Sequence, residues 1–123
     1  MIGVLLAVAG ALGAVLRYVV DSYVKFRFPR SALPWATIGI NISGSALLGV
    51  LAGLALARDG VTDLETIVGT GFCGGYTTFG TASVETVRLA QSGNATRAAS
   101  YALFTLVLSV GACAAGFAVA TLV

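Results

Sequence analysis

Residues 69–81 read Gly-Thr-Gly-Phe-Cys-Gly-Gly-Tyr-Thr-Thr-Phe-Gly-Thr, and this stretch lies inside an apolar run from about Leu64 to Ala90. Its five glycines and four threonines disfavour a continuous helix, because a glycine inside a helix costs about 1 kcal/mol relative to alanine. We therefore expect the helix to break near Gly74–Thr78. Non-helical backbone at membrane depth is tolerated only where protein or water covers it. The break thus indicates a packed interior or an aqueous path.

The whole chain has the composition of a membrane protein. Of its 123 residues, 58% are hydrophobic and 10% are charged, and its mean hydropathy is +0.97. A typical soluble domain has about 25% charged residues. This composition excludes a disordered chain, an ordinary soluble fold and a basic surface for nucleic acid. The two cysteines, Cys73 and Cys113, lie in apolar surroundings, and we interpret both as buried thiols.

Length and hydropathy together predict four membrane crossings, because one crossing takes about 20 apolar residues. The apolar runs extend from Ile2 to about Val24, from Pro34 and Trp35 to about Ala57, from about Leu64 to Ala90, and from Ala98 to Val123. We therefore expect an all-α membrane protein, with residues 1–123 forming a single four-helix transmembrane domain whose third helix is broken. One such chain is too short to enclose a sizeable pore, so we expect an oligomer.

The connections between the runs predict helix ends and orientation. Arg58-Asp59-Gly60 predicts the end of the second helix, and Asp63 with Glu65 predicts the start of the third. The connection on the side of the termini has one basic residue, Arg58, whereas the opposite side has five: Lys25, Arg27, Arg30, Arg88 and Arg97. The positive-inside rule then places the basic connections in the cytoplasm and both termini outside.

The second predicted helix has polar and small residues at intervals of four, so they share one face. They are Asn41, Ser45, Gly49 and Gly53. The small residues are typical of close helix packing in membranes. The Asn41 amide needs partners, and it lines either a polar interface or a water path.

The fourth predicted helix has a similar set at the same interval, namely Tyr101, Thr105, Ser109 and Cys113. Two interpretations of the hydroxyl groups stay open. They either bond back to carbonyl oxygens one turn earlier in the helix, or form a row of neutral donors. Such a row can guide an anion without holding it too tightly for conduction.

The break and the charged residues also leave alternatives open. Unwound carbonyl oxygens suit a hard cation such as Na⁺, although a packing kink has the same composition. Arg17 either forms a local ion pair with Asp21 or attracts anions into an aqueous vestibule. Glu85 and Arg88 are typical of a second local pair. The sequence has no Ser/His/Asp set, no phosphate-binding loop and no histidine at all, so we do not expect an enzyme.

Three stretches of the chain resemble the Fluc/CrcB family of small bacterial fluoride channels, and the resemblance covers essentially the whole sequence. They are residues 13–18 (Gly-Ala-Val-Leu-Arg-Tyr), residues 35–45 (Trp-Ala-Thr-Ile-Gly-Ile-Asn-Ile-Ser-Gly-Ser) and residues 71–79 (Gly-Phe-Cys-Gly-Gly-Tyr-Thr-Thr-Phe). The third is the most specific, because it joins a glycine-rich break to Thr-Thr-Phe. The resemblance implies an antiparallel dimer of four-helix subunits in the bacterial inner membrane. Two fluoride pores along the subunit interface would export fluoride passively and reduce its toxicity.

The resemblance also implies roles for single residues. Backbone carbonyls of Gly74 and Thr77, together with those of a second subunit, would hold a central Na⁺. The residues that match or accompany the family's fluoride path are Asn41, Phe79, Thr81, Tyr101, Thr105 and Ser109, and Arg17 stays a candidate for the vestibule. The expected partners are a second subunit, fluoride and membrane lipid, with no nucleic acid.

Two features depart from the family pattern, which continues Thr-Thr-Phe-Ser-Thr-Phe. The first is in the motif, where Gly80 replaces the serine and Ala82 replaces the second pore phenylalanine. The second is the uneven distribution of basic residues, which favours one orientation, whereas homodimers of the family insert in both orientations. We hypothesise one half of a heterodimer of paralogous subunits; the alternative is a homodimer whose pores tolerate Ala82. Alternatives from other classes are a non-conducting structural subunit and a small proton-coupled multidrug exporter. An exporter normally needs an intramembrane acid, and residues 2–16 contain none.

Overall fold

The computed structural model describes residues 1–58 and 60–123, and within them every regular element is a helix. The elements in chain order are α1 (Ile2–Arg27), α2 (Trp35–Ala57), α3 (Thr62–Leu64), η1 (Glu65–Cys73), α4 (Gly74–Tyr76), α5 (Phe79–Gln91) and α6 (Ala95–Thr121). The short helices α3, η1 and α4 follow one another directly and form one rod. The predicted all-α architecture with a broken third helix is therefore confirmed.

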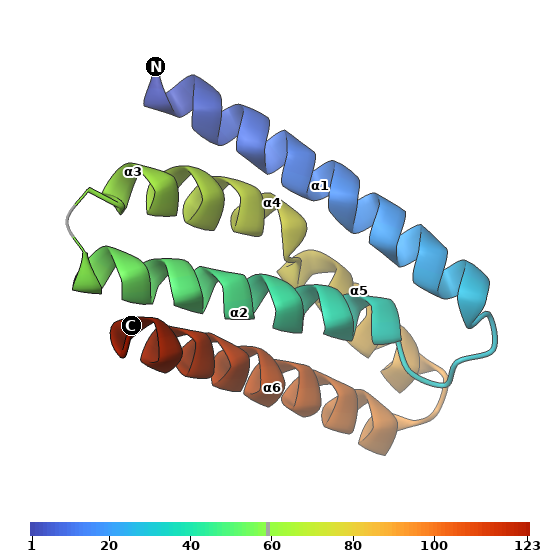
Figure 1. The fold of residues 1–123 in the computed structure, drawn as a ribbon. Coiled ribbons are helices and arrows are strands. Elements are labelled where there is room, and N and C mark those ends of the chain that lie inside the picture. Colours follow the sequence, from blue (N-terminus) through green and yellow to red (C-terminus); the bar gives the residue numbers. More distant parts are fainter. Residues whose placement is uncertain (59) are drawn as a thin grey trace.

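The helices run side by side along a common direction (Figure 1). Both termini and the connection between α2 and α3 lie at one end, and the other two connections lie at the opposite end. Among the described residues, α1, α2 and α6 are each long and apolar enough to cross a membrane. The protein is thus a multi-pass membrane protein whose two ends present different connections.

Two helices differ from the predicted bounds for local reasons. Helix α1 continues to Arg27, so Lys25 and Arg27 occupy its last turn, where positive charge interacts favourably with the helix dipole. Helix α6 begins at Ala95 because the Asn94 side chain accepts a hydrogen bond from the backbone N–H of Arg97. Helix α2 ends at Ala57 as expected, and Gly60, the predicted stop residue, has a positive φ of 85°. Position 59, between Arg58 and Gly60, lies outside the described residues.

Helix α2 is the centre of the fold, and it packs most extensively against α6. A Cβ added at Gly49 would overlap the backbone of Cys113, and one added at Gly53 would approach the carbonyl oxygen of Phe117. Gly116 of α6 is equally close to the Ala46 carbonyl. The prediction that the small residues of α2 permit close packing is confirmed.

This packing predicts that Gly49→Ala destabilises the protein. The added methyl group cannot be accommodated without separating α2 from α6, and overpacking of this kind typically costs about 1–3 kcal/mol. We expect a lower midpoint of thermal unfolding in detergent. Gly111→Ala is the matched control, because a Cβ at Gly111 meets no atom within 4 Å. Equal midpoints for the two variants would contradict the assigned packing.

The third run changes its partner along its length. Its first half, η1 and α4, packs against α1, whereas α5 packs against α6. A Cβ at Gly75 would overlap the Gly10 carbonyl oxygen, so this glycine is required for close approach to α1. The break lies within the predicted range Gly74–Thr78, at its threonines and not at its glycines. Residues 65–73 form a π-helix and residues 74–76 stay helical, and the chain unwinds only at the threonines that follow.

Candidate functional site

The break consists of two extended residues, Thr77 (φ −73°, ψ 160°) and Thr78 (φ −148°, ψ 118°). Asn41 of α2 satisfies both backbone groups of Thr78. Its Nδ2 donates to the Thr78 carbonyl oxygen at 3.0 Å, and its Oδ1 accepts the Thr78 N–H at 2.8 Å. The side-chain amide thus replaces the partners that a helix would supply, which an extended backbone in a membrane requires.

At the break, two backbone N–H groups no longer donate to the carbonyl oxygens that they would bond to in a helix. In a continuous α-helix the N–H of Thr78 would bond to Gly74 and that of Thr81 to Thr77. The Thr78 N–H instead donates to Asn41, and the Thr81 N–H donates to Thr78 Oγ1 at 3.1 Å. The carbonyl oxygens of Gly74 and Thr77 are therefore released from the helical pattern.

A cavity of about 390 Å³ lies between α2, α5 and α6, directly beside the break. It brings together five of the six residues predicted for a fluoride path: Asn41, Phe79, Tyr101, Thr105 and Ser109. Ser45, Thr77, Ser83 and Thr86 add further polar groups to its lining. The sequence spacing alone placed these residues on separate helices, and the fold joins them in one space.

Two hydroxyl groups of this cavity are buried without a partner. Thr105 Oγ1 and Ser109 Oγ have no hydrogen bond to any described residue, although Ser83 and Thr86 bond back to the carbonyls of Phe79 and Ala82. The back-bonding interpretation is therefore wrong for the α6 hydroxyls. An unsatisfied buried hydroxyl costs about 1–3 kcal/mol, so a polar ligand or water at this position is favoured.

Arg17 and Thr81 lie elsewhere, on a second cavity of about 160 Å³ that is also lined by Asp21, Thr37 and Thr78. Arg17 Nε donates to the Gly75 carbonyl oxygen at 3.2 Å, next to the break. The predicted Arg17–Asp21 pair was wrong, because Asp21 Oδ2 instead accepts from Lys25 Nζ at 2.7 Å. Lys25 lies one helical turn further along α1, where both side chains point to the same face.

Tyr101 lines the cavity beside the break and forms a hydrogen bond to Glu85, which lies nearer the basic end of the molecule. Its ring is buried, with 1% exposure, and its hydroxyl donates to Glu85 Oε2 at 2.8 Å. The predicted Glu85–Arg88 pair does not form within the described residues. Thr37 was not predicted as a polar residue of this region, and its buried Oγ1 has no partner among the described residues. It lies one turn before Asn41, so extending the four-residue spacing backwards would have found it.

The aromatic and small residues at the start of α5 form an open face. Phe79 is the first residue of α5 and is 88% exposed, and Gly80 beside it is exposed as well. Ala82 lines the cavity, where its methyl group leaves room that a larger side chain would fill. A ring so exposed at membrane depth indicates that lipid or another subunit covers this face.

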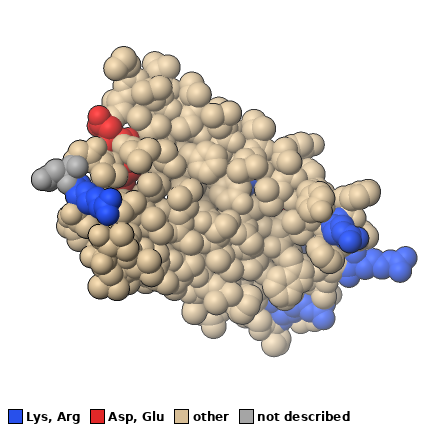
Figure 2. All heavy atoms as spheres, viewed as in Figure 1, with Lys and Arg blue, Asp and Glu red and all other residues tan. Residues whose placement is uncertain are grey.

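On the visible face, charged side chains gather mainly at the two ends (Figure 2). The visible face has basic atoms mainly at the end with the α1–α2 and α5–α6 connections, and acidic atoms together with some basic atoms at the end with the termini. Arg58 lies at the latter end, where its Nη2 donates to the backbone oxygen of Val123 at 3.4 Å. The arrangement agrees with the uneven distribution of basic residues in the sequence.

Comparison with known proteins finds one family and several relatives. The profile of the family described as "CrcB-like protein, Camphor Resistance (CrcB)" matches residues 4–117. A protein of Streptomyces avermitilis named "Fluoride-specific ion channel FluC 1" is 43% identical over 91% of this chain and 90% of its own. "Fluoride-specific ion channel FluC" of Nitrobacter winogradskyi is 44% identical over 89% and 87%. "Fluoride-specific ion channel FluC 2" of Mycobacterium tuberculosis H37Rv is 43% identical over 94% and 86%.

Proposed function

Because this chain belongs to the CrcB family, and since its relatives are named as fluoride-specific channels, we propose that it is a subunit of a fluoride channel. The channel lets fluoride leave the bacterial cell passively and so reduces its toxicity. The observation that carries this proposal concerns Thr105 and Ser109, two residues that line the cavity. Their hydroxyl groups are buried and have no hydrogen-bond partner among the described residues.

The chemistry of the cavity suits a small, strongly hydrated anion. Moving an ion out of water is costly unless protein donors replace the lost hydrogen bonds. The hydroxyls of Thr105 and Ser109 are such donors, and Asn41 keeps one N–H that its bond to Thr78 does not use. Phe79 adds the positive edge of a ring. All these groups are neutral, so they replace water without binding the anion too tightly to leave.

The carbonyl oxygens of Gly74 and Thr77 fit a structural Na⁺. Neutral oxygen atoms are the ligands that hard cations prefer, and unwound backbone supplies them in membrane transport proteins. Both oxygens have lost their usual helical donors to Asn41 and Thr78, which supports the assignment. The ion would contribute positive charge that ties two subunits together at their breaks.

The partner in our proposal is an antiparallel subunit that is not a copy of this chain. Five basic residues at one end against one at the other favour a single orientation in the membrane. Ala82 lines the cavity with a methyl group where the family pattern has a phenylalanine ring. The names FluC 1 and FluC 2 among the relatives fit a pair of paralogous subunits.

Replacing the hydroxyl of Thr105 should lower fluoride flux without lowering the stability of the protein. Thr105→Val keeps the shape of the side chain and removes an unsatisfied donor, so the midpoint of thermal unfolding should stay equal or rise. Fluoride flux should fall about tenfold, the equivalent of one lost hydrogen bond of about 1.4 kcal/mol. Flux is measured with a fluoride electrode on proteoliposomes that contain the chain and its partner.

The matched control for Thr105→Val is Thr66→Val. Thr66 lies on η1, outside the cavity, and its hydroxyl bonds back to the Thr62 carbonyl. This control should keep wild-type flux. Wild-type flux in Thr105→Val would remove this hydroxyl from the fluoride path.

A further inference from the structure

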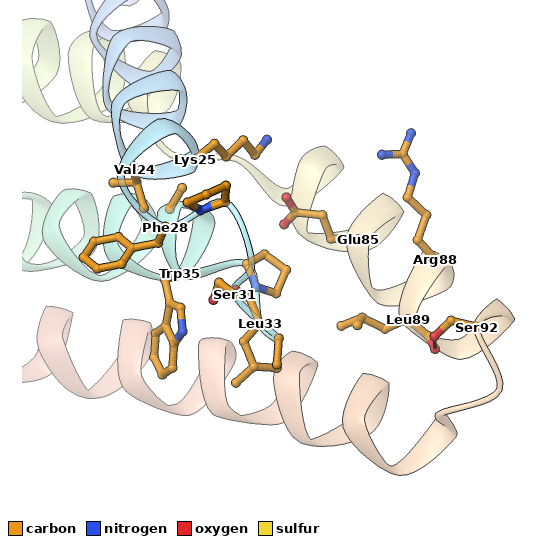
Figure 3. Close-up of a pocket in the computed structure, with 14 residues that line it drawn as sticks. Val24, Lys25, Phe28, Ser31, Leu33, Trp35, Glu85, Arg88, Leu89 and Ser92 are labelled. Atoms are coloured by element: carbon orange, nitrogen blue, oxygen red, sulfur yellow. Dashed lines mark hydrogen bonds between the residues drawn. The ribbon is translucent and has the colours of Figure 1, made fainter.

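A further cavity lies at the basic end of the protein, between the end of α1, the connection to α2 and the second half of α5 (Figure 3). Its volume is about 370 Å³, which is within the usual range for small-molecule sites. Its lining is mainly apolar and includes Phe28, Leu33, Trp35 and Leu89. Figure 3 shows Lys25 on α1 and Arg88 on α5 at its margins. An adjoining hollow shares Phe28 and Trp35 and adds Arg30.

The charges around this cavity favour an anion. Lys25 is paired with Asp21, whereas Arg30 and Arg88 form no ion pair with any described residue. The one carboxylate in the lining, Glu85, accepts a hydrogen bond from Tyr101. The cavity lining thus has Lys25 and the unpaired Arg88 against one acidic group, and the adjoining hollow adds the unpaired Arg30. Guanidinium groups bind phosphate in a bidentate manner.

The position of the cavity in the membrane indicates which kind of anion would bind there. It lies at the end of the spanning helices α1 and α2, and Trp35 and Phe28 at its edge are typical of the lipid headgroup level. An amphipathic molecule can place its apolar part against this lining and its charged group at the basic residues. A free inorganic anion would contact only the basic residues. The predicted cytoplasmic side of this end faces the leaflet in which anionic lipids attract basic residues.

We propose that this cavity binds an anionic phospholipid. The phosphate lies at the basic margin, where Arg88 lines the cavity and Arg30 the adjoining hollow, and the upper part of one acyl chain packs against Phe28, Trp35 and Leu89. A lipid held here connects α1 to α5, two elements that pack mainly on other partners. The binding is independent of fluoride conduction, so failure of either proposal leaves the other standing.

Native mass spectrometry of the purified protein with dioleoylphosphatidylglycerol and dioleoylphosphatidylcholine tests this proposal. The wild-type protein should retain the anionic lipid several-fold more than the zwitterionic one. Each basic residue near the membrane surface contributes about 1 kcal/mol, which is about fivefold in binding. The double variant Arg30→Gln, Arg88→Gln should therefore lose most of this preference.

Two controls distinguish this site from other sources of binding. Arg97→Gln removes a charge at the same end but outside the cavity, and it should keep the preference for phosphatidylglycerol. Inorganic phosphate should not raise the midpoint of thermal unfolding, whereas phosphatidylglycerol should. Equal retention of the two lipids by the wild type, an equal loss in Arg97→Gln, or stabilisation by phosphate alone would each overturn the proposal.

Discussion

Asn41→Asp is expected to abolish fluoride flux. The substitution places a carboxylate on the cavity that the anion must cross, and two like charges about 4 Å apart near a protein surface repel by about 4 kcal/mol. That energy corresponds to about a thousandfold loss of flux. The second carboxylate oxygen would also face the Thr78 carbonyl, where Asn41 Nδ2 now donates at 3.0 Å. The geometry of the break is therefore weakened as well.

Gln91→Glu is the matched control for this experiment. It makes the same change from amide to carboxylate, at the exposed last residue of α5 and outside the cavity. Its flux should remain within about twofold of wild type, since exposed charges are screened. Flux measured on proteoliposomes that is unchanged by Asn41→Asp would exclude this amide from the fluoride path.

The chain expressed alone is expected to give no fluoride resistance to a fluoride-sensitive bacterial strain. Its basic residues direct it into the membrane in one orientation, and an antiparallel pair needs the opposite orientation too. Coexpression with a paralogous subunit of opposite charge distribution should restore growth in fluoride. Fluoride efflux should be faster from the coexpressing cells than from cells that contain this chain alone, because an unpaired subunit leaves its cavity open on one side.

Cysteine labelling from outside the cell provides the control for orientation. A cysteine introduced at Ser92, in the basic connection, should be inaccessible, and one at Leu122 should be labelled. Labelling at both positions, or growth in fluoride with this chain alone, would refute the heterodimer and favour a homodimer that tolerates Ala82.

Most of the fold can be predicted from the sequence, because the length of an apolar run and the residues at a helix end depend on neighbouring positions in the chain. Apolar runs of sufficient length define the four helical passes, and Arg58-Asp59-Gly60 predicts the end of α2. The Asn94 cap, which starts α6 three residues before the predicted Ala98, was not predicted. The exact site of the break is less local. Glycines 69, 71 and 75 stay helical because they pack closely on neighbouring helices, and the chain unwinds at Thr77 and Thr78, where Asn41 supplies substitute hydrogen bonds.

The partners of polar groups depend on helix rotation and could not be predicted. Arg17 bonds to Gly75, 58 positions away, and Tyr101 bonds to Glu85, so both expected local ion pairs failed. The spacing of Thr105 and Ser109 predicted a shared face of α6, but only the packing of α2 and α5 against it turns that face into a cavity. Contacts between distant segments therefore decide which polar residues are free for a ligand.

The most direct test of the central claim is anion efflux from liposomes that contain the purified chain with its paralogous partner. We expect fast release of fluoride, followed by electrode, with no measurable release of chloride from the same vesicles. Thr105→Val should slow the fluoride signal and Asn41→Asp should remove it. No release of fluoride with either a paralogous partner or a second copy of the chain, or release of chloride at the same rate, would contradict a fluoride channel in which these residues line the path.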